Sequence, residues 1–170
     1  MKISFWKINK NFRWSTPVQR TTGAMIFDCV FLAMLAVVWG VIIWLISRAP
    51  STVPTHFGAS GQPDAWGSPT HHLIPQAIIT VVALIMLAGA YFPKSTLNLP
   101  GYDKEKANAR QHQLAAWLVR IMAAFMLAVM LLLALSTFVL NNHSIVPVIV
   151  LLGVMVAVII VFSILMHRAK

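Results

Sequence analysis

The sequence predicts an all-α integral membrane protein with four transmembrane helices, cytoplasmic termini and an ordered extracytoplasmic loop between the first two helices. Of its 170 residues, 59% are hydrophobic and only 10% are charged, whereas about a quarter of the residues in soluble domains are charged. Four segments each hold about 20 mostly apolar residues, the length that crosses a bilayer. In lipid the backbone must satisfy its own hydrogen bonds, so each segment is expected to be a helix.

A single membrane domain at residues 22–170 is expected to follow a basic, aromatic arm at residues 1–21. Its helices are predicted at about 22–46, 73–92, 114–140 and 145–166, with an outer loop at 47–72 and a cytoplasmic loop at 93–113. The first helix is too long for the apolar core of a signal peptide. Ser68 stands before Pro69 as an N-cap stands before the first helical residue. Asp103 could likewise cap a helix that runs from Lys104 into the third span.

Basic residues set the predicted orientation. They gather before the first helix, between the second and third helices and at the C-terminus, at Lys2, Lys7, Lys10, Arg13, Arg20, Lys94, Lys104, Lys106, Arg110, Arg168 and Lys170. The positive-inside rule therefore places these segments in the cytoplasm. Since the net charge of +9 is not spread as a nucleic-acid patch, a lipid bilayer is the predicted partner and no nucleic acid is expected. The N-terminal arm is either an interfacial anchor or an ordinary positive flank with aromatic residues.

Two charged residues, Asp28 and Arg120, lie inside predicted helices. Each is about two turns from the cytoplasmic end of its helix, so equal depth and opposite sign make them natural partners. A lone charge at mid-bilayer costs at least about 3 kcal/mol, so a partner or a water-filled pocket is expected. Three interpretations remain open: a gate or proton-coupled site, a buried pair that fixes helix packing, or an arginine that extends to the headgroups.

The outer loop holds an unusual stretch, STVPTHFGASGQPDAWGSPTHH, from Ser51 to His72. Pro54 and Pro63 fix their own backbone angles, and the glycines permit tight reversals. The rings of Phe57 and Trp66 are suited to the headgroup level of a bilayer. This composition predicts a compact loop packed on the membrane surface, with a short hairpin that reverses near GASGQ.

These residues resemble the signature of a bacterial membrane domain of unknown function, which also forms the N-terminal part of Sdp-type immunity proteins. The signature positions are Pro54, His56, Phe57, Gly61, Pro63, Asp64, Gly67 and Ser68. The tryptophan of the signature, Trp66, stands directly before Gly67. A second match comprises Asn98, Pro100, Asn108 and Gln111. The resemblance extends over about residues 30–135. Such immunity proteins protect a producing cell from its own secreted peptide toxin, so the resemblance implies a protein of the bacterial plasma membrane that meets a peptide outside the cell.

Catalytic chemistry has little support in the sequence. The candidate zinc ligands on the outer side are His56, Asp64, His71, His72 and His143. Imidazole and carboxylate are common zinc ligands, but this spacing matches no known ligand pattern. The alternative is that His56 and Asp64 bond each other or the loop backbone. Because no nucleophile motif or phosphate-binding loop is present, no cofactor is expected and the sequence favours a protein that is not an enzyme.

Three functions follow from these observations. The favoured one is the binding or sensing of an extracytoplasmic peptide or partner membrane protein by the outer loop. A small transporter or transporter subunit is the second, and it would need a polar path through the bundle. The few polar residues noted for such a path are Thr80, Ser136, Thr137 and Ser163. The third is a metal-dependent membrane enzyme that uses the outer histidines.

Overall fold

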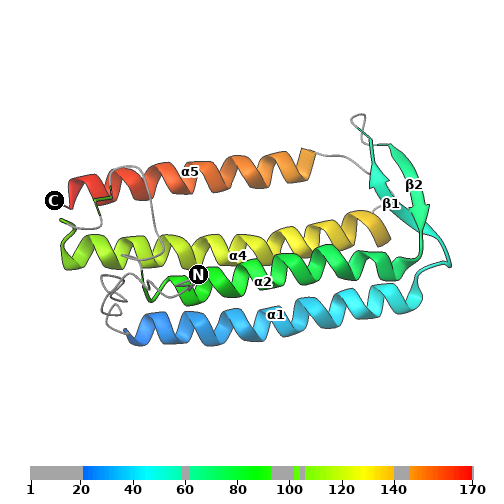
Figure 1. Cartoon of the computed structure of the whole chain (residues 1–170), viewed down its shortest axis with the longest axis horizontal. Coiled ribbons are helices and arrows are strands. Elements are labelled where there is room, and N and C mark those ends of the chain that lie inside the picture. The colour runs from blue at the N-terminus through cyan, green and yellow to red at the C-terminus, as the bar shows by residue number, and fades with distance from the viewer. Residues whose placement is uncertain (1–20, 59–61, 93–101, 104–105, 140–145, 170) are drawn as a thin grey trace, which may run out of the picture.

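The computed structural model describes residues 21–58, 62–92, 102–103, 106–139 and 146–169. Within these residues, four helices are long and apolar enough to cross a membrane, as the sequence predicts. They are α1 (Thr22–Arg48), α2 (Leu73–Gly89) together with the turn that begins it at Pro69, α4 (Ala109–Phe138) and α5 (Val146–Arg168). These helices lie side by side along the long axis of the molecule (Figure 1). Between α1 and α2 the chain forms an antiparallel hairpin of β1 (Val53–Phe57) and β2 (Pro63–Gly67), followed by the 3-10 turn η1 (Pro69–His72).

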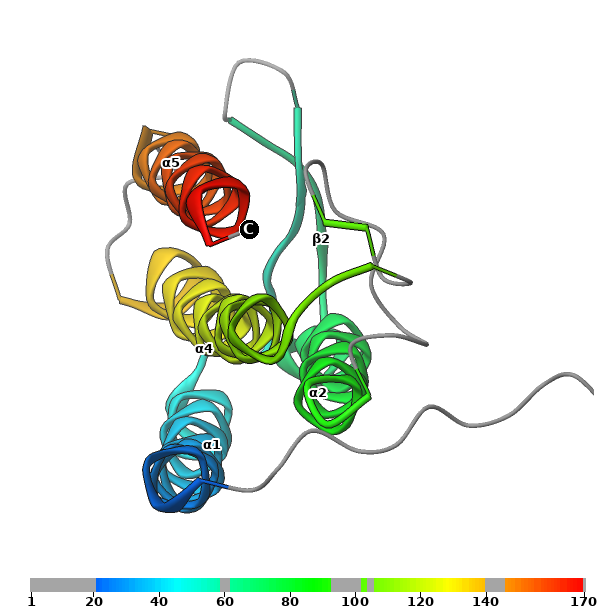
Figure 2. The ribbon, with the colours of Figure 1, turned by 90° about the vertical axis from the view of Figure 1, so that its left-hand side faces the viewer.

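The central helix of the bundle is α4. It packs against α1, α2 and α5, which surround it when the bundle is viewed along its axis (Figure 2). One apolar core joins α1, α2 and α4 through the fully buried Ile42, Ala83 and Met130. A second core joins α4 to α5 around Leu118 and Met166. The outward faces of the helices carry large exposed apolar side chains, which suits a surface in contact with lipid tails.

Two helix boundaries differ from those predicted. The structure begins α4 at Ala109, not at Lys104, because Asn108 caps this helix and Asp103 does not. The carbonyl of Asp103 instead closes a separate turn just before the cap. The second span ends at Gly89 rather than at residue 92. With its start at Ala109, α4 is 30 residues long. Its capping residues Asn108 and Gln111 lie beside the end of α5.

Candidate functional site

The outer loop predicted from the sequence is a hairpin held by polar contacts between its strands. Gly58 N–H donates to the Gln62 carbonyl oxygen at 2.9 Å, next to the reversal. His56 Nδ1 lies 2.5 Å from Asp64 Oδ1. The two residues therefore bond each other, as expected from the alternative to a zinc site. Their side chains are 69% and 51% exposed. Water therefore screens this pair, which contributes more to the shape of the hairpin than to stability. Gly61 lies outside the described residues.

His72 attaches the hairpin to the helices. Its Nε2 donates to the Pro54 carbonyl oxygen at 2.9 Å, and because a carbonyl only accepts, this nitrogen carries the proton. The same ring packs edge-on against Phe138 at the end of α4, with the ring centroids 5.2 Å apart. Ser68 caps the intervening η1 turn, as predicted, by accepting the Thr70 N–H at 3.4 Å. One imidazole thus connects β1, the start of α2 and the end of α4.

Gly67 stands where the hairpin comes closest to the turn that follows it. A Cβ at this position would lie 2.9 Å from His71 Nδ1 and 3.2 Å from Thr55 Cγ2. Any other residue would push these neighbours apart, which gives a steric reason for glycine at this point of the signature. Because Gly67 has no Cβ, the side chains of Thr55 and His71 can approach the backbone that joins β2 to η1.

The two strands of the hairpin have different exposure. In β1, Val53 and Pro54 are buried. In β2, Asp64, Ala65 and Trp66 are exposed, with Trp66 at 63%. The hairpin therefore turns β1 toward the bundle and presents an aromatic ring and a carboxylate on β2.

The candidate zinc ligands do not come together in the described residues. No group of three or more His, Cys, Asp and Glu side chains in that part of the chain is placed to hold a metal ion. His56 and Asp64 bond each other, and His72 is turned to a backbone carbonyl. His143 lies outside the described residues. A zinc site requires at least three protein ligands, so the described histidines do not form one.

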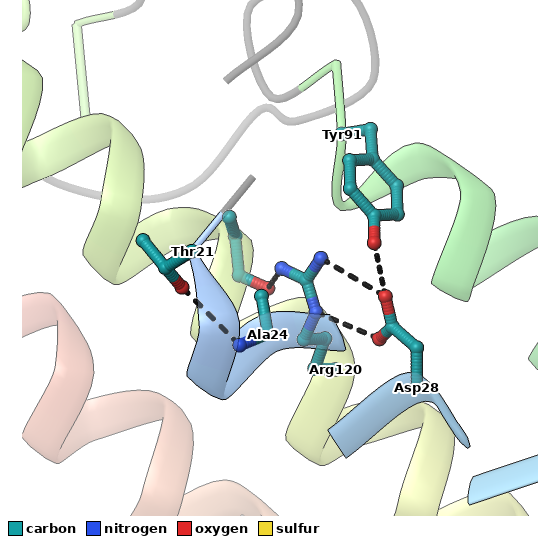
Figure 3. A network of polar contacts seen from close by, with 6 residues as sticks. Thr21, Ala24, Asp28, Tyr91 and Arg120 are labelled. Atoms are coloured by element: carbon teal, nitrogen blue, oxygen red, sulfur yellow. Dashed lines mark hydrogen bonds and ion pairs between the residues drawn. The ribbon is translucent and has the colours of Figure 1, made fainter. Parts of the chain in front are cut away.

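Asp28 lies near the start of α1, at the end of the bundle opposite the hairpin (Figure 1), and there it meets Arg120 (Figure 3). Arg120 Nε donates to Asp28 Oδ1 at 2.9 Å, and Nη2 donates to Oδ2 at 3.4 Å. The hydroxyl of Tyr91, just past the end of α2, also donates to Oδ2. The guanidinium carbon lies 4.7 Å from the Tyr91 ring centroid and 5.8 Å from that of Trp117. With side chains only 4% and 14% exposed, the pair needs these added contacts to offset the cost of burying two charges.

A second polar contact joins α1 to α2 nearer the hairpin. Trp39 Nε1 donates to Thr80 Oγ1 at 3.0 Å, and this hydroxyl donates to the Gln76 carbonyl oxygen at 2.8 Å. The Gln76 amide nitrogen donates to the Met130 carbonyl oxygen at 3.2 Å. Gln76 is only 1% exposed, and its Oε1 has no partner among the described residues. Thr80 was predicted as a polar residue of the bundle and Gln76 was not, although residues four apart share one helical face.

Asn108 and Gln111 connect the start of α4 to the end of α5. They form a reciprocal capping box, with 3.0 Å bonds from each backbone N–H to the side chain of the other. Asn108 Nδ2 also donates to the Ala169 carbonyl oxygen at 2.6 Å, and Gln111 Nε2 donates to that of Met166 at 2.9 Å. The last carbonyls of a helix have no partner within it, so these two side chains satisfy the ends of two helices. Asn98 and Pro100 lie outside the described residues.

Tyr102 packs beside this connection. It is 6% exposed, and burial raises the pKa of Tyr102 to about 12. The phenol therefore keeps its proton, and its oxygen lies 2.6 Å from His112 Nδ1, within hydrogen-bonding distance. This contact holds the segment before the cap against the first turn of α4.

Comparison with known proteins identifies the segment that carries the hairpin. Residues 33–80 match a domain of unknown function, DUF1648. The matched segment contains most of α1, the hairpin, η1 and the start of α2, and so includes every signature position between Pro54 and Ser68. An uncharacterized protein of Archaeoglobus fulgidus is 31% identical over 97 residues, which are 52% of this chain and 52% of the archaeal protein. The chain thus spans about half the length of the curated relative that it matches. Comparison with solved structures gave no match.

Proposed function

We propose that this chain is a multi-pass protein of the plasma membrane whose hairpin binds or senses an extracytoplasmic peptide or a partner membrane protein, in the manner of Sdp-type immunity. The observation that carries the proposal is the exposure of Trp66 on a hairpin whose other strand is fixed to the bundle. The resemblance of the loop to that domain supports the same function.

The geometry suits recognition for two physical reasons. The bonds from His56 to Asp64 and from His72 to Pro54 hold the hairpin in one shape, and a segment that is already ordered pays less entropy when it binds. Exposed tryptophans are the side chains that most often dominate binding energies at protein interfaces. Both features lie on the part of the chain that carries the signature.

The test is protection of cells from a secreted peptide. A strain sensitive to membrane-active peptides would express the parent chain, Trp66→Ala or Trp44→Ala. The last is a matched control, because Trp44 is an exposed tryptophan on α1 and lies outside the hairpin. We expect survival with the parent and with Trp44→Ala, and loss of survival with Trp66→Ala at equal protein levels. Failure of the parent to protect against any peptide, together with capture of no membrane partner, would contradict the proposal.

The proposal includes an orientation, with both termini in the cytoplasm and the hairpin outside. It is supported by the basic residues, which gather at the N-terminal arm, the 93–113 segment and the C-terminus. In a Cys29→Ala background, we expect a membrane-impermeant thiol reagent to label Ala59→Cys in intact cells and to leave Ala107→Cys unlabelled. Labelling after permeabilisation shows that each cysteine is reactive. The opposite labelling pattern in intact cells would show that the hairpin faces the cytoplasm, contrary to the proposed orientation.

A further inference from the structure

A small cavity lies beside Arg120 at the end of the bundle opposite the hairpin. Its volume is about 20 Å³, which is enough for one oxygen atom with its hydrogens. The residues that line it include Thr21, Ala24, Tyr91, Gln113, Trp117 and Arg120. Figure 3 shows the guanidinium group of Arg120 between Thr21 and the Tyr91 side chain. A buried cation thus faces a space large enough for one ligand atom.

Arg120 has hydrogen-bonding capacity beyond its bond to Asp28. A guanidinium carries five N–H donors, and among the described residues only the Nε bond to Asp28 has an ordinary length, 2.9 Å. The Nη2 bond to Asp28 is 3.4 Å long, and the Nη1 bond to the Ala116 carbonyl is 3.5 Å long. Both lie at the weak end of the range for hydrogen bonds. An additional oxygen acceptor would therefore find available donors.

The first turn of α1 adds positive potential at the same place. Thr21 caps this helix and accepts the Ala24 N–H at 3.2 Å, and both residues line the cavity. The first backbone N–H groups of a helix have no partner within it, so this end attracts anions. The Arg120 guanidinium and the first N–H groups of α1 are donors, and the partial positive charge of a helix N-terminus favours an anionic oxygen over a neutral one.

The cavity also lies at the end of a helix that is longer than the hydrocarbon core of a bilayer. A 27-residue helix such as α1 is about 40 Å long, whereas the hydrocarbon core is about 30 Å thick. When α1 is centred in the bilayer, its first turn extends into the headgroup layer. Since Thr21 and Ala24 belong to this turn, a phospholipid beside α1 would carry its phosphate close to the cavity.

We propose that this cavity binds a phosphate oxygen of an anionic phospholipid, with Arg120 as the buried donor and Gln113 at the exposed mouth. The site is independent of the hairpin and of any peptide that the hairpin recognises. Asp28 holds the Arg120 side chain in place through the Nε bond. The lipid phosphate oxygen accepts hydrogen bonds from the Nη1 and Nη2 groups, whose bonds within the protein are long.

The test measures which lipids remain bound to the purified protein by native mass spectrometry. Micelles would contain equal amounts of phosphatidylglycerol and a neutral galactolipid, which has no phosphate group. We expect the parent to retain phosphatidylglycerol about fivefold in preference, the effect of one basic residue at a membrane surface. Gln113→Leu and Arg120→Lys should reduce this preference to near unity. Arg110→Gln is the matched control: it removes an exposed charge at the same end, lines no part of the cavity and should keep the preference.

Each outcome bears on the proposal. Displacement of the lipid by excess inorganic phosphate would keep the oxyanion site and identify free phosphate as a competing ligand. Equal retention of the two lipids by the parent would overturn the proposal. So would a loss of preference in Arg110→Gln that Gln113→Leu does not show, because attraction would then depend on overall charge. Gln113 is exposed, so its substitution by leucine tests the site without removing a core residue, whatever the stability of Arg120→Lys.

Discussion

Asp28→Asn and Arg120→Gln are each expected to lower the free energy of unfolding by about 3–5 kcal/mol, the usual cost of leaving one member of a buried ion pair without its partner. Both side chains are largely buried, so water replaces the lost contact poorly. The double substitution should cost less than the sum of the two single ones, because it removes both charges. Thermal unfolding in a mild detergent, analysed as a double-mutant cycle, measures this coupling.

Tyr91→Phe is the control for this cycle. It removes one hydroxyl that donates to the Asp28 carboxylate but leaves the ion pair, so a loss of about 1.5–3 kcal/mol is expected, smaller than the loss in Asp28→Asn. Strictly additive losses in the double variant would show that Asp28 and Arg120 do not stabilise each other. A loss in Tyr91→Phe as large as that in Asp28→Asn would instead assign the main role to the tyrosine.

Gln111→Leu is expected to cost about 1–3 kcal/mol, because it removes two hydrogen bonds and leaves the Met166 carbonyl only the 3.3 Å bond from the Ala169 N–H. The Gln111 side chain accepts the Asn108 N–H and donates to the Met166 carbonyl, and it is only 4% exposed. Loss of the second bond should also loosen the end of α5. Melting temperature in detergent reports the first effect, and hydrogen exchange at the last turn of α5 reports the second.

Gln113→Leu is the matched control, since the same change is made two residues away on an exposed side chain. In zwitterionic detergent it should alter the melting temperature little. If Gln111→Leu and Gln113→Leu behaved alike, the connection between α4 and α5 would not depend on the Gln111 amide.

The spans were predictable because the thickness of a bilayer and the absence of water in it leave few alternatives for long apolar segments. The partnership of Asp28 and Arg120 followed from their equal depth and opposite charge. The start of α4 was misplaced because Asp103 and Asn108 are both good capping residues. A capping box also needs Glu or Gln three residues on. Gln111 meets this need for Asn108, whereas Lys106 fails it for Asp103, so the signal was present and was not used.

Other features of the sites depend on contacts between distant segments. Nothing near His72 in the sequence indicates that its ring would lie between the Pro54 carbonyl and Phe138. Tyr91 stands just past the end of α2, and its bond to Asp28 depends on how far that helix is from α1. Such contacts arise from packing in three dimensions, and one sequence carries no periodic pattern for them.

The two side-chain bonds between α1 and α2 determine which relative motions of these helices remain. Asp28 and Trp39 are eleven residues apart, as are their respective partners Tyr91 and Thr80. Eleven residues make about three helical turns, or roughly 16 Å, so the helices are fastened at two levels along one line. Sliding or scissoring would break at least one bond. A swing of α2 about this line would keep both bonds but would break the bond from Gln76 to the Met130 carbonyl of α4, so α1, α2 and α4 are locked together as one rigid unit.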